Sequence, residues 1–262
     1  MYERGTLPRI LTILTNAFRE AVRDRILYNL ILFVLLITVS AIFLGELTAG
    51  QEARVIVNLG LSSILIFGTF ISIFVGVSLV WKEIEKKTVY SIFSKPVGRG
   101  EFIIGKYLGL CLTLFVNVAV MGAGVTLALL YVNGGGLIGA IWPAILLIFL
   151  ELTILTAIAI MFSSFSTPAL SALLTFFVFV IGHFSASLRD LAQEMGSTTA
   201  RLVFDAIYYL LPNLSHFSFI TESSNGMTPP PAMIGGSLLY ALIYDLVILT
   251  ITVVIFSRRN FK

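Results

Sequence analysis

Long apolar runs alternate with short polar stretches along the chain, and six of the runs approach the roughly 20 residues that a helix needs to cross a ~30 Å hydrocarbon core. The predicted spans cover residues 26–45, 55–80, 107–131, 141–162, 168–188 and 235–257. The pattern therefore predicts an all-α integral membrane protein, with residues 1–262 forming a single transmembrane domain.

The first 25 residues have a different pattern, because apolar and polar positions alternate with the period of a helix. The apolar positions are Leu7, Ile10, Leu11, Leu14, Ala17, Phe18, Ala21 and Val22. Arg9, Arg19 and Arg23 lie on the opposite face. A basic amphipathic helix of this kind is predicted to lie at the membrane surface, and it lacks the unbroken apolar stretch of a secretory signal.

Residues 189–233 separate the last two predicted spans and are less apolar. They contain a helical apolar stretch of about 12 residues before Pro212, which is too short to span a bilayer. We expect an outer re-entrant or interfacial helical segment that caps the bundle, followed by a proline-rich turn into the last span.

Composition supports membrane insertion. Hydrophobic residues make up 58% of the chain, charged residues only 12%, and the mean hydropathy is +0.99. A soluble domain carries about 25% charged residues, so this chain cannot cover a water-facing surface. The net charge of +3 comes from basic residues at the edges of apolar runs, which argues against nucleic-acid binding. The single cysteine, Cys111, excludes an intrachain disulfide and is interpreted as a packing residue.

The distribution of Lys and Arg predicts the orientation of the chain. Of the 17 basic residues, 14 lie on the side that carries both termini and the polar stretch 81–106, and 3 lie on the other side. Both termini and residues 81–106 are therefore predicted to be cytoplasmic.

Two carboxylates fall inside predicted spans: Glu151 in the fourth and Asp245 in the sixth. Intramembrane carboxylates are costly and often mark a transport pathway, so both residues are candidates for a substrate route. The structural alternative is a protonated acid that donates to, or accepts from, a Thr, Ser or Tyr on a neighbouring helix. His183 and His216 are isolated, and no metal site is expected at either.

Small residues recur at helical spacing on two spans. Gly68, Ser72 and Gly76 share one face of the second span, and Gly105 and Gly109 share one face at the start of the third. Such rows let helices approach closely, either within the chain or at a dimer seam. We also count Gly68, Ser72 and Gly76 as candidates for the substrate route.

Residues 100–106 match the first seven positions of a phosphate-binding P-loop, but Tyr107 stands where Ser or Thr would hold magnesium. The match also precedes a membrane span where a P-loop precedes a soluble helix. We therefore expect the chain to bind no cofactor and to be no enzyme by itself, with any ATP used by a partner.

The polar stretch 81–106 carries six basic residues between two apolar runs. Its first part, WKEIEKKTVYSIFS, has helical character, and Pro96 with the glycines that follow ends the helix. A loop that only set the orientation would not need Trp81, Tyr90 and Phe93. We interpret it as a short cytoplasmic helix that docks into a soluble partner.

This stretch resembles the segment between the second and third spans of ABC transporter permeases of the type-2 exporter class. The resemblance rests on Glu83 and Glu85, then KTVYSIFSKPV, then Arg99 and GEFIIGKYLG, and the overall architecture agrees with it. Lys87-Thr88 stands where Gly-Thr is usual, which leaves the helix intact.

The resemblance implies a subunit of the bacterial inner membrane that pairs with a second permease, most simply as a homodimer, and recruits separate ATPase subunits that carry ATP and magnesium. The second and fifth spans of the two permeases would enclose the substrate route, and a further partner on the outer side is left open. The short helix would be the coupling helix that contacts the ATPase through Lys82, Glu83, Ile84, Glu85, Lys86, Lys87, Thr88, Tyr90 and Phe93.

Two other functions remain open at this point. An ATP-independent secondary transporter or channel would depend on Glu151 and Asp245 and would tolerate disruption of residues 81–106. A membrane scaffold would anchor soluble partners and move nothing. The aliphatic and aromatic residues of the spans fit a lipid, a hydrophobic drug or a peptide and specify none of them.

Overall fold

A computed structural model describes residues 6–21, 50–85, 98–194 and 211–258, together with residues 32, 33, 36, 37, 40, 43, 202, 204–206 and 208. For residues 21, 84, 85 and 186–194 it describes the backbone alone. The elements of the described part are all helical: α1 (Thr6–Ala21), α3 (Glu52–Glu85), α5 (Arg99–Tyr131), η2 (Gly135–Leu137), α6 (Ile138–Ser163), α7 (Pro168–Glu194), η3 (Leu214–Phe217), α9 (Ile220–Ser224) and α10 (Pro231–Arg258).

Five helices of the described part are long and apolar enough to cross a membrane, namely α3, α5, α6, α7 and α10. They coincide with the second to sixth predicted spans, so the prediction of an all-helical, multi-pass protein is confirmed. The first predicted span, 26–45, lies largely outside the described residues, although Phe33 and Ile37 from it are buried in the core.

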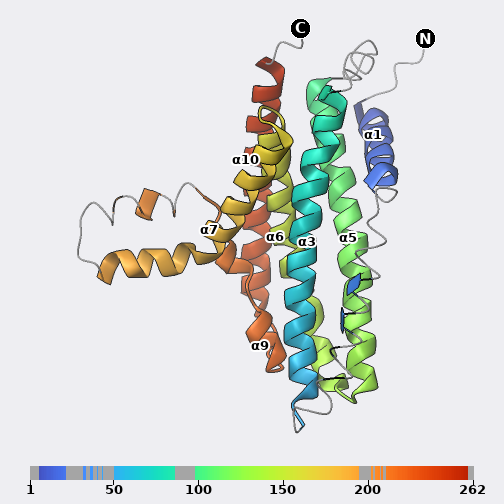
Figure 1. The fold of residues 1–262 in the computed structure, drawn as a ribbon, viewed down its shortest axis with the longest axis vertical. Helices are drawn as coiled ribbons and strands as arrows, with labels where there is room; N and C mark the ends of the chain where they lie inside the picture. The colour runs from blue at the N-terminus through green and yellow to red at the C-terminus, as the bar shows by residue number, and fades with distance from the viewer. Residues whose placement is uncertain are drawn as a thin grey trace.

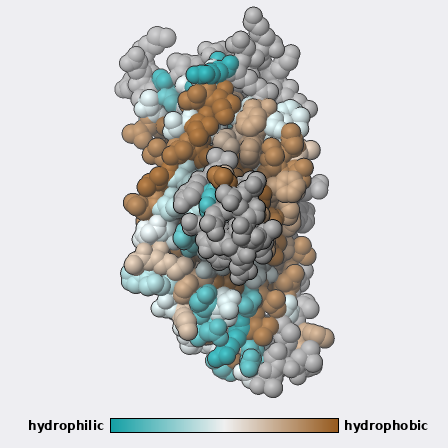
Figure 2. Space-filling model, turned by 90° about the vertical axis from the view of Figure 1, so that its left-hand side faces the viewer, coloured by the Kyte–Doolittle hydropathy of each residue, from teal (hydrophilic) through white to brown (hydrophobic). Residues whose placement is uncertain are grey.

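The long helices run side by side along the long axis of the molecule (Figure 1). The start of α5 and the ends of α3 and α10 lie at the end where both termini are marked, and α1 lies beside α5 near this end. The turn between α5 and α6, together with α9, lies at the opposite end, and the last turns of α7 leave the bundle sideways. In Figure 2, apolar residues cover much of the length of the visible face, and hydrophilic residues gather near its two ends.

The helix α6 is the centre of the bundle, because it packs against α3, α5, α7 and α10. Every residue from Glu151 to Ile160 is buried. A helix that is apolar on all sides is expected in such a position. By contrast, α10 exposes large apolar side chains such as Leu239 and Leu246, which suits contact with hydrocarbon or with another apolar surface.

The small residues of α3 bring it against α6. A Cβ added at Gly68 would lie 2.4 Å from Leu152 Cδ1, and one at Gly76 would lie 3.0 Å from the Cβ of Ala159. Between them, the Ser72 hydroxyl donates to the carbonyl of Leu152 over 3.4 Å. Of the two roles open from the sequence, this row serves packing within the chain.

The glycines of α5 bring it against α1. A Cβ added at Gly105 would lie 2.7 Å from Ile13, and one at Gly109 would lie 2.6 Å from the Cβ of Ala17 and 2.8 Å from the carbonyl oxygen of Leu14. The amphipathic helix α1 therefore packs closely against the first turns of α5, because Gly105 and Gly109 have no side chains to hold it away.

We predict that Gly109→Ala lowers the stability of the protein while Gly124→Ala does not. Both variants gain the same helix propensity, about 1 kcal/mol. At Gly109, however, the new methyl group would overlap the backbone of α1, and such overpacking costs about 1–3 kcal/mol. At Gly124 the nearest atom, Phe33 Cε1, lies 3.8 Å away.

Thermal unfolding in detergent micelles measures the difference. Equal unfolding temperatures for the two variants would contradict the close contact between α1 and α5.

Candidate functional site

The described structure contains both ends of the polar stretch 81–106. The helix α3 continues through Trp81, Lys82 and Glu83 to Glu85, so residues 82–85 extend the second span without a break. The helix α5 begins at Arg99, within the region where the sequence predicts the end of the short helix. Residues 86–97 lie outside the described residues, and with them the predicted contacts Lys86, Lys87, Thr88, Tyr90 and Phe93.

The start of α5 is fixed by a local cap. The backbone N–H of Gly98 donates to Glu101 Oε2 over 2.9 Å, and the carbonyl of Gly98 accepts from the N–H of Phe102 over 3.1 Å. A carboxylate that accepts from the backbone ahead of the first turn is a common way to begin a helix. The helix starts eight residues before the predicted span at 107 because the apolar run marks only the part inside the hydrocarbon core.

A buried lysine joins three helices at the base of this stretch. Lys106 on α5 lies with its Nζ 2.5 Å from Glu83 Oε1 on α3 and 3.3 Å from Glu20 Oε2 on α1. Its side chain is only 5% exposed, and its Nζ lies 5.9 Å from the centroid of the Phe102 ring. An ammonium group can be buried in this way only if carboxylates compensate its charge, so the three residues depend on one another.

This ion cluster, formed by Glu20, Glu83 and Lys106, changes the interpretation of two sequence features. The P-loop-like stretch 100–106 is the first part of α5, and its lysine is bound to two carboxylates. Glu83 was predicted as a contact for a partner, but its carboxylate binds Lys106 and so joins the end of α3 to the start of α5. The other contacts predicted for the partner stay predictions, because no partner chain is present.

A second, weaker contact joins α1 to α5 near the same end. Arg9 Nη1 lies 4.0 Å from Glu101 Oε2, the carboxylate that caps α5. Both side chains are partly exposed, so the pair adds at most about 1 kcal/mol. It lies next to the ion cluster and reinforces the same contact between helices.

The two intramembrane carboxylates both contact side chains of other helices. Tyr107 on α5 donates its hydroxyl to Asp245 Oδ2 on α10 over 2.7 Å, and Asp245 is 7% exposed. Glu151 on α6 is 1% exposed, and its Oε1 lies 3.4 Å from His183 Nδ1 on α7. The hydrogen bond from Tyr107 favours the structural interpretation of Asp245, in which the carboxyl group helps to hold α10 against α5. Glu151 Oε1 and His183 Nδ1 lie close together but form no hydrogen bond, so the role of Glu151 stays a prediction.

The contact between Glu151 and His183 was missed from the sequence, although a signal for it exists. The helices α6 and α7 are joined by a tight link, and Glu151 precedes the end of α6 by 12 residues while His183 follows the start of α7 by 15. Two residues at similar distances from such a link lie at a similar depth in the membrane. Counting residues outward from this link would therefore have predicted that Glu151 and His183 lie near each other.

The described outer segment is fastened to α10 through Asn213. The backbone N–H of Asn213 donates to the Tyr240 hydroxyl over 2.9 Å, and its side chain accepts from Ser185 on α7 over 3.0 Å. The ring of His216 lies beside that of Tyr240, with centroids 5.9 Å apart. An open hollow of about 480 Å³ lies here, lined by Ser215, His216, Met233, Gly236, Ser237 and Tyr240.

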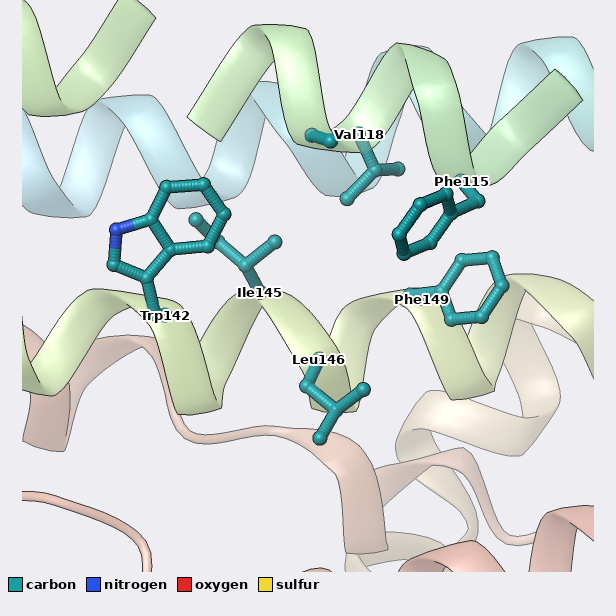
Figure 3. Close-up of a pocket in the computed structure, with 7 residues that line it drawn as sticks. Phe115, Val118, Trp142, Ile145, Leu146 and Phe149 are labelled. Carbon is teal, nitrogen blue, oxygen red and sulfur yellow. The ribbon is translucent and has the colours of Figure 1, made fainter. Parts of the chain in front are cut away.

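A small apolar pocket of about 120 Å³ lies between α5 and α6 (Figure 3). Its walls are Phe115, Val118, Ala119, Trp142, Ile145, Leu146 and Phe149. Phe115 and Phe149 meet edge to face at one end, with centroids 5.7 Å apart, and Trp142 stands at the other end. The pocket offers apolar contact alone and contains neither Glu151 nor Asp245.

These features define a multi-pass helical membrane protein in which the two helices that flank a basic stretch, α3 and α5, are joined by an ion pair where α3 ends. A family model described as "ABC-2 family transporter protein" matches residues 11–261, and the chain belongs to this family. It is similar to the "Probable ABC transporter permease protein NosY" of Pseudomonas aeruginosa, with 27% identity over 241 residues that cover 85% of this chain and 87% of that protein.

The resemblance noted in the sequence is thereby confirmed, and the chain is a membrane subunit of an ABC transporter. In such transporters the permease component is not itself the ATPase, so an ATPase partner is implied. The polar stretch 81–106 is then the candidate site at which that partner acts.

We predict that Lys106→Met destabilises the protein strongly and that adding Glu83→Gln restores part of the loss. The single variant leaves the Glu83 carboxylate without its cation, and breaking a buried pair costs about 3–5 kcal/mol. The amide that replaces this carboxylate in the double variant carries no charge and needs no cation.

Unfolding in mixed detergent micelles gives the free energy of each variant, with Lys82→Met as the matched control. Lys82 lies next to Glu83 at the end of α3 and is partly exposed, so its replacement should cost less than that of the buried Lys106. The Glu83→Gln variant completes the cycle, and a coupling energy near zero between positions 83 and 106 would contradict the mutual dependence of these residues.

Proposed function

We propose that this chain is the membrane half of an ATP-driven exporter of the bacterial inner membrane, working as a homodimer. It receives energy from a separate cytoplasmic ATPase through the coupling helix within residues 81–106. The observation that carries the proposal is the ion cluster of Glu20, Glu83 and Lys106 at the base of that loop.

A loop transmits force to the membrane helices only if its two ends cannot move independently. Here the ends belong to α3 and α5, and the Glu83–Lys106 pair joins them over 2.5 Å. Glu20 adds α1 to the same junction. Movement of the loop is therefore passed to three helices together, and α3 carries it to α6 through Gly68, Ser72 and Gly76.

The orientation supports an ATPase on this side. The end of α3, the start of α5, α1 and the end of α10 lie at one end of the bundle (Figure 1), and the sequence predicts that 14 of its 17 basic residues are on this side. Basic residues are retained on the cytoplasmic side of membrane proteins, where ATP is available. ATP and magnesium bind to the partner in this proposal, and the chain contributes no phosphate site.

The apolar surfaces of α7 and α10 support pairing with a second copy. Their exposed side chains include Leu173, Phe177, Leu242 and Leu246, each between 49% and 68% exposed. In a bilayer this surface is suited to lipid or to another subunit, and the resemblance to dimeric permeases favours a second copy for part of it.

We predict that replacing Tyr90 and Phe93 with alanine abolishes the binding of the partner ATPase. Truncation of an aromatic residue at the centre of an interface typically costs about 2 kcal/mol or more, which is roughly 30-fold in affinity. Glu83, Ile84 and Glu85 are left unchanged because Glu83 also holds the ion cluster.

The measurement is co-purification of the co-expressed ATPase and its rate of ATP hydrolysis. Tyr131→Ala, which removes an exposed aromatic residue at the opposite end of α5, is the control. Unchanged binding and hydrolysis with the Tyr90/Phe93 variant would reject the coupling function, whereas loss of both in that variant alone would support it.

A further inference from the structure

The first three turns of α5 also contact the cytoplasmic half of α10. Arg99 Nη1 donates to the carbonyl oxygen of Phe256 over 3.3 Å and to that of Ser257 in a shorter contact. Residues 99 and 256 are far apart in the sequence, so this contact joins the end of the loop to the last helix of the chain. Arg99 is the first residue of α5, immediately after the stretch 86–97 and Gly98.

Arg99 binds carbonyl groups from the last turn of a helix, where hydrogen-bond donors within the helix are missing. The last four carbonyl groups of a helix have no donor within it. Phe256 and Ser257 lie in the last turn of α10 as the structure describes it, up to Arg258. A guanidinium group supplies several donors from a rigid plane, and its positive charge complements the negative end of the helix dipole. Arg99 thus caps α10 from a neighbouring helix.

Two further contacts join α5 to α10 closer to the middle of the bundle. The ring of Phe102 stacks on that of Phe256 with centroids 5.8 Å apart, and both side chains are fully buried. Deeper still, Tyr107 donates to Asp245 over 2.7 Å. Over roughly 12 Å of α5, from Arg99 to Tyr107, contact with α10 is therefore maintained by a charged, an aromatic and a hydrogen-bonded pair.

The same stretch of α5 contains Lys106, which binds α1 and α3. One short helical segment thus connects the loop to α10 on one side and to the ion cluster on the other. The members of the ion cluster belong to α1, α3 and α5, whereas the guanidinium group of Arg99 ties the end of α10 to this segment.

We propose that Arg99 is a positioning residue that makes α10 move as one body with the start of α5 when the ATPase acts on the loop. This inference rests on the proposed function. Without the guanidinium group, the end of α10 loses its charged contact with the first residue of α5 and can lag behind α5 when the loop moves.

The test follows the distance between α5 and α10 in the complex with the ATPase. Spin labels at Leu108→Cys and Val254→Cys, both on exposed positions, report this distance in a Cys111→Ala background. Labelled chains are diluted with unlabelled ones so that only distances within a chain are read. The states compared are nucleotide-free and ATP-bound, the latter trapped with a hydrolysis-deficient ATPase.

The variants are Arg99→Gln, which removes the charge and leaves a shorter amide donor, and Arg99→Lys, which keeps the charge but loses the planar fork. Arg258→Gln is the matched control, because it removes one positive charge from the same end of α10. The distance should stay the same in both states for the unmodified chain and for the control. It should shift by several ångströms on ATP binding in Arg99→Gln, and by less in Arg99→Lys.

The outcomes separate this inference from the proposed function. If the ATPase does not bind the unmodified chain, the proposed function fails and this inference fails with it. If the ATPase binds normally but the distance stays fixed in both Arg99 variants, only this inference is overturned. A lowered stability without a nucleotide-dependent shift would give Arg99 a purely structural role and would equally overturn it.

Discussion

The burial of the Lys106 ammonium group is the constraint on which the end of the bundle where α3 ends and α5 begins depends. A lysine that is 5% exposed must have carboxylates within contact distance, and the two that lie there come from different helices. Their positions force α1, α3 and α5 to meet at one point. Because Glu83 and Lys106 flank the polar loop, the same constraint fixes the distance between its two ends.

Close packing at glycines links the helices of this ion cluster to one another and to α6. Gly105 and Gly109 let α1 lie on α5, and Gly68 and Gly76 let α3 lie on α6. Where side chains are this small, helices approach closely and slide or tilt less freely. The hydrogen bond from Tyr107 to Asp245 then holds α10 to this framework, and α7 packs against α6 and α3.

Much of the fold could be predicted because a bilayer permits few solutions. The lengths of the apolar runs located α3, α5, α6, α7 and α10, and the helical stripe of residues 7–22 located α1. The glycine rows signalled close packing, although the sequence could not say which helix would be the partner. The first predicted span and residues 86–97 lie largely or wholly outside the described residues, so a six-span layout and the coupling helix stay predictions.

The candidate site was less predictable, because its contacts join residues that are distant in the sequence. Lys106 was counted among the residues that orient the chain, yet its partner Glu20 lies 86 residues earlier. Glu83 looked like a surface residue because charges at the end of a span usually face water. Arg99 was counted among the basic residues of the polar stretch and named in the resemblance to ABC permeases, and nothing local to it indicated the carbonyls of α10. The depth of His183, in contrast, was readable from the short link between α6 and α7.

The central claim is that energy from a partner ATPase enters this chain through residues 81–106. Photo-crosslinking in cells tests it most directly, with a photoreactive amino acid placed at position 90 or 93 and, as controls, at the exposed outer positions 131 and 227. The account predicts that positions 90 and 93 crosslink to a protein with ABC ATPase motifs and that the outer positions do not. Absence of an ATPase from the products at 90 and 93, or its capture from the outer positions, would contradict the account.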